Sequence, residues 1–299
     1  MASLKKVALQ LNIKDYYCSQ DELYIEKKDG KLWLYVNVSD LCPCSCPFCV
    51  NPCWKNGENL FDLIRYRDVL TQIKDVVYGV SFTGGEPLLF PEQLGDALKI
   101  TNEIIGPDVE LDLTTCGIGL ERFLKEQASD LLFSIHISRH LVNDDANRKL
   151  MGANTPGVSE LKSIVRNMRE PGRVVLNCVL HKDGVHSTES MAVYLEMAAE
   201  IGVTNTSFIG LINANNFCRE QYIDPRNLHP EKDARFRVWN QFHDHSFCNC
   251  SSGDYEATAG WVRFYYRSPG KEAAPYARQL VYTADNKLLA GFGGEVIFS

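Results

Sequence analysis

The chain has 299 residues, with 31 lysines and arginines against 38 aspartates and glutamates, and a formal net charge of −7 at neutral pH. At 45% hydrophobic and 23% charged residues, it has the composition of a soluble folded protein, long enough for one large α/β domain or a domain with an appendage. The net acidity argues against general nucleic-acid or membrane-surface binding. No apolar run approaches the roughly 20 residues that span a bilayer, and no signal peptide follows Met1. We therefore expect a cytoplasmic protein.

Short β-branched or aromatic runs alternate with longer amphipathic runs from residue 31 onward. This alternation predicts a parallel sheet built from βαβ units. The predicted strands are 32–38, 76–82, 109–114, 131–137, 174–180 and 205–209, and the predicted helices are 60–74, 91–105, 120–127, 158–169 and 190–201. Residues 31–215 are thus expected to form a partial (β/α)6 barrel. Its strands should be near-continuously apolar, because strands of a parallel sheet are buried on both faces.

The chain on either side of this barrel has a different pattern. In the N-terminal segment, residues 1–30, the run 23–26 is expected to form a hairpin with the first barrel strand around Asp29-Gly30, a tight-turn signal. After residue 215 the alternation stops, and the runs 261–267, 279–282 and 287–290 predict antiparallel strands. Residues 216–299 are therefore predicted to form a small, mainly β C-terminal subdomain.

Cysteines are crowded into one segment. Of the 11 cysteines, five lie between Cys42 and Cys53, which in a reducing compartment indicates metal or cluster ligation rather than a disulfide framework. Only Cys42, Cys46 and Cys49 have the spacing C-x3-C-x2-C. Three thiolates on one loop can hold three irons of a [4Fe–4S] cluster and leave the fourth iron open. The loop follows a predicted strand, at the edge where α/β folds place their chemistry.

A structural zinc site is the alternative for these cysteines, since Cys44 and Cys53 could complete it by proximity. Zinc sites usually present two separated C-x2-C knuckles, and the second knuckle is missing, so the spacing favours the cluster. A second motif, Gly84-Gly85-Glu86-Pro87, follows the second predicted strand. Its glycines let the backbone approach a ligand closely. Alone it would indicate an ordinary turn, but it lies one βα unit after the cysteine loop.

Together, Cys42-x3-Cys46-x-Phe48-Cys49 and the Gly-Gly-Glu-Pro motif resemble the radical S-adenosylmethionine (SAM) superfamily. Weaker matches follow in chain order. Residues 113–117 are similar to the family's Thr-Thr-Asn-Gly turn after strand three, with Cys116 in place of the asparagine. Residues 134–138 resemble the serine motif of strand four, and residues 175–177 resemble the strand-five asparagine motif.

The resemblance implies a cofactor site and a reaction. A [4Fe–4S] cluster on Cys42, Cys46 and Cys49 would be chelated at its open iron by SAM, and its one-electron reduction would generate a 5′-deoxyadenosyl radical that abstracts a hydrogen atom from the substrate. A reductant such as flavodoxin or ferredoxin is implied. The implied SAM contacts are Phe48 near the adenine, the loop of Gly84, Gly85, Glu86 and Pro87 at the methionine amino group, and Thr115, Ser134 and Asn177 at the ribose or carboxylate. Phe48 is equally a plain packing aromatic.

Basic side chains near the ends of strands four and five are candidate substrate contacts. Arg139 and His140 would face a bound ligand, and arginine suits a phosphate or carboxylate. A helix-capping loop with solvated charges explains this pair equally well. His136 lies inside a predicted strand, where a satisfied core histidine is at least as good an interpretation as a ligand contact, and His181 lies just beyond strand five.

The C-terminal residues 277–290 look like part of the auxiliary-cluster domain in the molybdenum-cofactor GTP cyclase and its SPASM/twitch relatives. Those families place cluster cysteines near Ala290 and just before Arg278, and this sequence has neither. The pair Cys248-x-Cys250 matches no cluster spacing. We therefore expect a twitch-like remnant that covers the substrate without a cluster of its own.

The sequence thus predicts a radical SAM enzyme with a single cluster, acting on a small-molecule or nucleotide-like substrate. A maturase of a ribosomal peptide is an alternative within the family. The alternative from another class is a non-catalytic metal-binding or iron–sulfur redox protein, against which the Gly-Gly-Glu-Pro loop argues.

Overall fold

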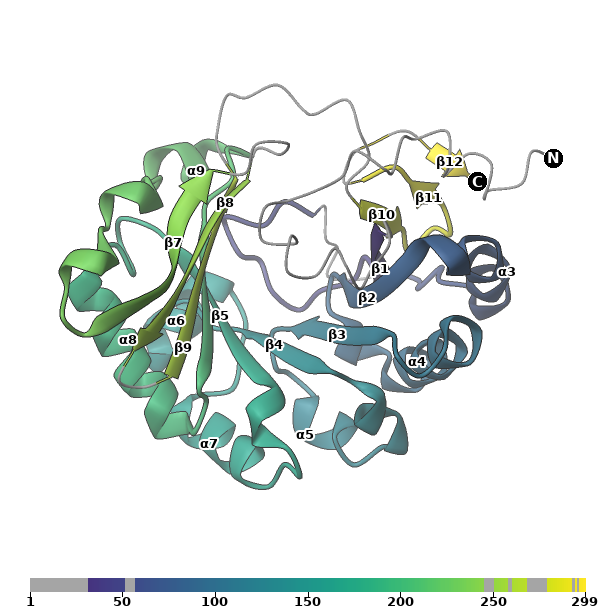
Figure 1. Ribbon diagram of the computed structural model, residues 1–299. Coiled ribbons are helices and arrows are strands. Elements are labelled where there is room, and N and C mark those ends of the chain that lie inside the picture. Colours follow the sequence, from purple (N-terminus) through teal and green to yellow (C-terminus); the bar gives the residue numbers. More distant parts are fainter. Residues whose placement is uncertain are drawn as a thin grey trace.

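The computed structural model describes residues 32–51, 57–244, 250–257, 260–267, 279–291, 294 and 296–299. The predicted N-terminal hairpin, Cys53 and Cys248 lie outside these residues. The described strands form one curved sheet in the order β12-β11-β10-β1-β2-β3-β4-β5-β6-β9-β8-β7. Helices cover its convex face, and we call its concave face the lumen (Figure 1).

The barrel strands are β1 Leu32–Ser39, β2 Val77–Gly84, β3 Glu110–Thr115, β4 Ser134–Ser138, β5 Val174–Leu180 and β6 Asn205–Gly210. The helices are α3 Leu63–Ile73, α4 Pro91–Ile105, α5 Leu120–Phe123, α6 Asp144–Met151, α7 Val158–Arg166, α8 Thr188–Ile201 and α9 Asn216–Glu220. Each barrel strand pairs in parallel with the next. The expected partial barrel is therefore confirmed, and none of the helices in the described residues is long and apolar enough to cross a membrane.

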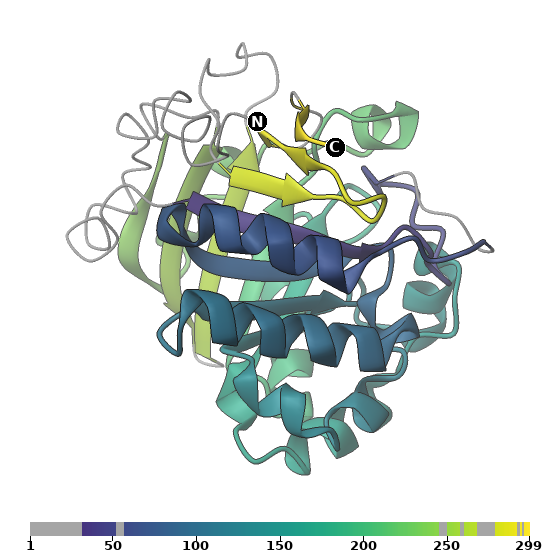
Figure 2. The same ribbon diagram turned by 90° about the vertical axis from the view of Figure 1, so that its right-hand side faces the viewer.

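Local signals set the ends of the longer helices. Pro91 occupies the first turn of α4, where a missing N–H costs nothing. Ser187 caps α8 by accepting from the Ser190 N–H, and Gly202 ends the helix at φ +96°. Figure 2 shows α3 and α4 side by side across the outer face of the sheet.

Two predicted segments differ from the structure. The helix predicted at 120–127 ends at Phe123 and is followed by a 3-10 helix, Gln127–Leu131, so β4 begins at Ser134 rather than at residue 131. The structure also contains α6, which was not predicted. Asn143 caps it by accepting from the Ala146 N–H, and Gly152 ends it at φ +66°. Its polar composition hides the helix from a search for apolar periodicity.

The strands alternate between buried and half-buried side chains. In β1 the pattern begins Leu32 buried, Trp33 half-buried, Leu34 buried, and β3 and β5 alternate in the same way. The buried positions pack against the helices, and the half-buried positions face the lumen. The expectation of near-continuously apolar strands holds for β5, in which Asn177 is the polar residue. It does not hold for β3 and β4, whose lumen positions carry polar side chains such as Asp112, Ser134 and His136.

The C-terminal strands extend the barrel sheet at both edges. They are β7 Phe236–Asp244, β8 Cys250–Ala257, β9 Gly260–Arg267, β10 Gln279–Tyr282, β11 Leu288–Leu289 and β12 Val296–Phe298. β9 joins β6 in parallel, and β8 and β7 follow it in antiparallel order. β10 joins β1 in parallel, and β11 and β12 follow it in antiparallel order. The predicted division at residues 30/31 and 215/216 stays a prediction.

Gly260 is where β9 attaches to β6, and we expect Gly260→Ala to lower the free energy of unfolding by roughly 1–3 kcal/mol. Gly260 has φ +128°, and a Cβ there would lie 2.2 Å from the carbonyl oxygen of Thr204. The Trp261 N–H donates to this same oxygen at 2.7 Å. Urea unfolding followed by circular dichroism measures the change. Gly172→Ala is the control, because a Cβ at Gly172 meets nothing within 4 Å, and equal losses in both variants would contradict this account.

Candidate functional site

Two loops meet where β1 and β2 end. We call residues 40–51 the cysteine loop and residues 84–87 the glycine loop. Because β1 and β2 are parallel neighbours, their carboxyl ends lie at the same edge of the sheet. The Gly85 N–H donates to the Ser39 carbonyl at 2.6 Å, and the Glu86 N–H donates to the Leu41 carbonyl at 2.8 Å. These two hydrogen bonds join the loops along their backbones.

The two glycines are required for this approach. Gly84 has φ +118°, and a Cβ there would lie 2.5 Å from the Ser39 oxygen. A Cβ at Gly85 would lie 2.2 Å from the Leu41 oxygen. The side-chain amide of Asn51 adds a third link by donating to the Gly84 carbonyl at 3.1 Å. Any larger residue at position 85 would therefore push the loops apart.

The three cysteines of the C-x3-C-x2-C motif are not joined in disulfides, and thiolates are the ligand type that iron–sulfur clusters require. Cys42 is buried, Cys46 is half-buried and Cys49 is exposed. The Cys46 thiol lies 3.9 Å from the Met151 carbonyl oxygen. Within the described residues, no three His, Cys, Asp or Glu side chains are grouped to hold one metal ion. A cube binds each thiolate to a different iron, so its ligands do not converge on one point, and the donor set fits this cofactor.

Cys44, which lies outside the C-x3-C-x2-C spacing, is buried in a small cluster with Cys42, Cys116 and Met151. A contact with the Cys44 thiol, together with burial, raises the pKa of the Cys116 thiol. Cys116 stands where the resemblance has an asparagine, so this position serves here as a packing partner of the cysteine loop.

The Glu86 side chain extends the junction to a third loop. Its carboxylate is 1% exposed and accepts from the Leu88 N–H at 3.1 Å, the Thr115 hydroxyl at 2.6 Å and the Cys116 N–H at 2.7 Å. Burial raises the pKa of the Glu86 carboxyl, and these hydrogen bonds oppose the rise. Pro87 follows in the 3-10 helix Pro87–Leu89. Glu86 and Thr115 thus hold the loops after β2 and β3 together.

Aromatic rings line the other side of the cysteine loop. The Phe48 ring packs edge-on against His140, with centroids 4.7 Å apart, and tilted against Phe217 at 6.3 Å. His140 Nδ1 accepts from the Val179 N–H at 3.1 Å, and burial lowers the pKa of this imidazole to about 3. His140 is therefore neutral. His181, 2% exposed, lies 6.1 Å from Phe217, and neither of its ring nitrogens has a hydrogen-bond partner in the described part of the chain.

Arg139 does not face the lumen as a free cation. Its side chain is 1% exposed and donates through Nη2 to the Asp144 carboxylate at 2.6 Å and to the Val142 carbonyl at 2.7 Å. Its Nε lies 3.0 Å from the Met197 sulfur. These contacts fix the connection from β4 to α6, and the geometry gives no support for Arg139 as a substrate contact.

A polar chain crosses the lumen on β3, β4 and β5. The Ser134 hydroxyl donates to Asp112 Oδ1 at 2.6 Å, and His136 Nε2 lies 3.9 Å from Asp112 Oδ2. On its other side, His136 Nδ1 lies 3.2 Å from Asn177 Oδ1. The structure thus brings Ser134, His136 and Asn177 together, with Ser134 at the amino end of β4. Sequence reasoning missed Asp112, although its alternation with Leu111 and Leu113 marks it as a lumen residue.

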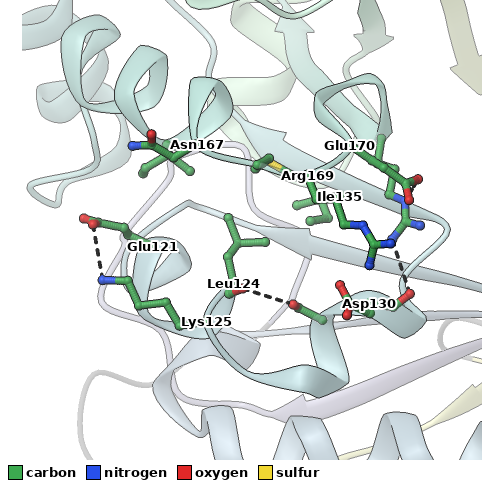
Figure 3. A pocket seen from close by; sticks show the side chains of 12 residues that line it. Glu121, Leu124, Lys125, Asp130, Ile135, Asn167, Arg169 and Glu170 are labelled. Carbon is green, nitrogen blue, oxygen red and sulfur yellow. Dashed lines mark hydrogen bonds and ion pairs between the residues drawn. The ribbon is translucent and has the colours of Figure 1, made fainter.

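A cavity of about 390 Å³ lies away from these loops, on the helix side of the sheet (Figure 3). Ile135, which is buried between the lumen residues Ser134 and His136, forms part of its wall. Leu124 of the α5 region and Asn167 after α7 line it from either side. Because it opens on the outer side of the barrel, this cavity does not belong to the site at the cysteine loop.

The fold and the joined loops define a class of protein. Residues 36–195 match the model of the Radical SAM superfamily. This segment contains both the cysteine loop and the glycine loop, and it covers more than half of the chain. The chain belongs to the radical SAM superfamily. Membership implies that it binds SAM and a [4Fe–4S] cluster.

Several characterised proteins are similar to this chain. GTP 3′,8-cyclase of Aquifex aeolicus (strain VF5) is 29% identical over 160 residues, which are 50% of this chain and 48% of the cyclase. The chain therefore spans about half the length of this relative. SuiB of Streptococcus suis bound to S-adenosylmethionine has the same fold, with a TM-score of 0.58 and 15% identity over 92% of this chain and 64% of SuiB. SuiB bound to its precursor peptide SuiA aligns with a TM-score of 0.58 and 14% identity over 91% of this chain and 63% of SuiB.

We expect Glu86→Gln to lower the free energy of unfolding by about 1–3 kcal/mol, because an amide NH2 replaces one acceptor oxygen and leaves a buried donor unpaired. Guanidinium unfolding followed by circular dichroism measures the loss. Glu92→Gln is the matched control, since Glu92 is an exposed carboxylate paired only with Arg122 at the surface. A Glu86 variant as stable as the Glu92 variant would show that Glu86 does not hold these loops together.

Proposed function

We propose that this chain holds a [4Fe–4S] cluster on Cys42, Cys46 and Cys49 and uses it to cleave SAM reductively, so that a hydrogen atom is abstracted from a substrate in the lumen. The observation that carries this proposal is the double backbone junction between the cysteine loop and the glycine loop. This junction supports the proposal because it joins the loop of the three cysteines to a backbone segment that requires glycine at positions 84 and 85. A ligand that binds the cluster would also reach the glycine loop.

When bound, the cluster and SAM supply an electron and a sulfonium, whose reaction gives methionine and a 5′-deoxyadenosyl radical. The chain's own residues bind and orient these groups. The glycine loop would accept the methionine amino group, while Phe48, held against His140 and Phe217, would pack beside the adenine. Asn177, which contacts His136, would reach the ribose or carboxylate from the lumen.

One side of the cysteine loop is exposed, so an electron donor can approach the loop there. Cys49 is the exposed thiol of the three, and the neighbouring Val50 is 53% exposed. Cys42, in contrast, is buried. We expect a small reductant of the flavodoxin or ferredoxin type to dock over Cys49 and Val50.

A small-molecule substrate is favoured over a ribosomal peptide. A second cavity, of about 350 Å³, lies on the lumen side of the sheet and includes His136 in its wall. That volume is typical of small-molecule sites. The alternative of peptide maturation draws on the similarity to SuiB, whose structure with a precursor peptide shares this fold. Incubation of the reduced protein with candidate small molecules and peptides would distinguish the two by which one increases 5′-deoxyadenosine release.

The proposal predicts which cysteines hold iron. Alanine at Cys42, Cys46 or Cys49 is expected to abolish both the cluster and the release of 5′-deoxyadenosine from SAM with dithionite as reductant. Cys44→Ala is expected to keep the cluster, because Cys44 packs against Cys116. Iron per chain and the electron paramagnetic resonance signal of the reduced cluster, measured after anaerobic reconstitution, test this.

Cys44→Ala is the matched control because it removes a thiol from the same loop. If this variant lost its iron while one of the other three kept it, the assignment of ligands would be wrong. If all variants bound iron and none released 5′-deoxyadenosine, the chain would be a non-catalytic iron–sulfur protein.

A further inference from the structure

The lumen cavity of about 350 Å³ is built mainly by strands outside the cofactor loops. Asn205 and Ser207 of β6 and the β7–β9 strands form most of its wall, and His136 closes it on the β4 side. The lining residues that carry the argument below are His136, Trp239, Asp254, Trp261 and Arg263. Concave sites of this size with a few convergent polar groups are typical of small-molecule binding.

Arg263 is held in this wall by a neighbouring strand. Arg263 and Asp254 are paired across β9 and β8, and Arg263 Nε donates to Asp254 Oδ1 at 2.8 Å. The Asp254 side chain is 18% exposed, whereas the Arg263 side chain is 58% exposed. Because Nε is engaged by the carboxylate, the two terminal amino groups form the accessible edge of the guanidinium. That planar edge matches the oxygens of a carboxylate or a phosphate.

Two indole rings lie in the same wall. Trp239 and Trp261 meet edge to face, with centroids 5.3 Å apart and an interplanar angle of 89°. They are 68% and 43% exposed, although tryptophan is on average a highly buried residue. Exposed indoles in a cavity offer stacking surfaces for a flat ring.

One side chain links the cavity to the residues expected to contact SAM. His136 lines the cavity, and its Nδ1 lies 3.2 Å from Asn177 Oδ1. A molecule in the cavity would therefore lie one side chain away from Asn177.

We propose that this cavity is a subsite for a small molecule that combines a flat ring with a carboxylate or phosphate group. The ring packs on Trp239 and Trp261, and the oxyanion binds the terminal amino groups of Arg263. The identification of this ligand as the substrate rests on the proposed function. The prediction that the cavity binds such a ligand does not.

Defined probes are titrated into the reconstituted holoenzyme with SAM bound, and calorimetry measures how tightly each probe binds. Phenylacetate and phenyl phosphate combine the same ring with a carboxylate or a phosphate, phenol has the ring alone, and acetate and inorganic phosphate have the anion alone. The combined probes are expected to bind at least tenfold more tightly than either part, and the tighter of the two identifies the oxyanion. Arg263→Gln should remove this preference for the charged probes, and Trp239→Ala should remove the preference for a ring.

Arg237→Gln is the matched control. Arg237 and Glu256 form the same kind of cross-strand pair on β7 and β8, at 3.4 Å, outside the cavity. The affinity of the Arg237→Gln variant for the combined probes should stay within twofold of the wild-type affinity. Equal binding of charged and uncharged probes, or an equal loss in the Arg237 and Arg263 variants, would overturn the proposal. Release of 5′-deoxyadenosine is scored separately, so that a protein that cleaves SAM but ignores every probe contradicts only this subsite.

Discussion

Two backbone hydrogen bonds, from Gly85 to Ser39 and from Glu86 to Leu41, are the contacts on which the site depends. They hold the cysteine loop at a fixed distance from the glycine loop, and a side chain at either glycine would break them. The Glu86 carboxylate then accepts a hydrogen bond from Thr115, the last residue of β3. Three successive loops at the carboxyl edge are therefore one unit, so a change in any of them would disturb the position of the thiols.

The polar lumen is the second constraint on this structure. A barrel filled by side chains would place apolar residues there. Here Ser134 and His136 face the lumen, and polar groups away from bulk water must be paired. The Ser134 hydroxyl donates to Asp112, and His136 contacts Asn177. The result is a wall whose side chains are held in place by their own hydrogen bonds.

Sequence periodicity predicted the barrel because β5 and α4 have strong apolar patterns and clear ends, and both were predicted with their observed bounds. It failed for α6, whose polar sequence is stabilised by the Asn143 cap and the Gly152 terminus. The cysteine spacing and the glycine motif identified the two loops that the structure joins, because both are local in sequence. The cavity at Trp261 and Arg263 was not predictable, since it arises only when β9 pairs with β6, more than 50 residues earlier in the chain.

The cysteine and glycine loops and the wall of the lumen cavity are therefore built in different ways. The cofactor loops lie within residues 36–195, the part that matches the family, and their geometry is fixed by backbone contacts that tolerate few changes. The cavity wall lies mostly beyond residue 195, on strands β6 to β9, and its contacts come from exchangeable side chains. Under the proposed function, the backbone-built loops would hold the cofactors, while the side chains of the added strands would select the substrate. We therefore propose that the charge and rings of that wall, rather than the two loops, recognise the substrate.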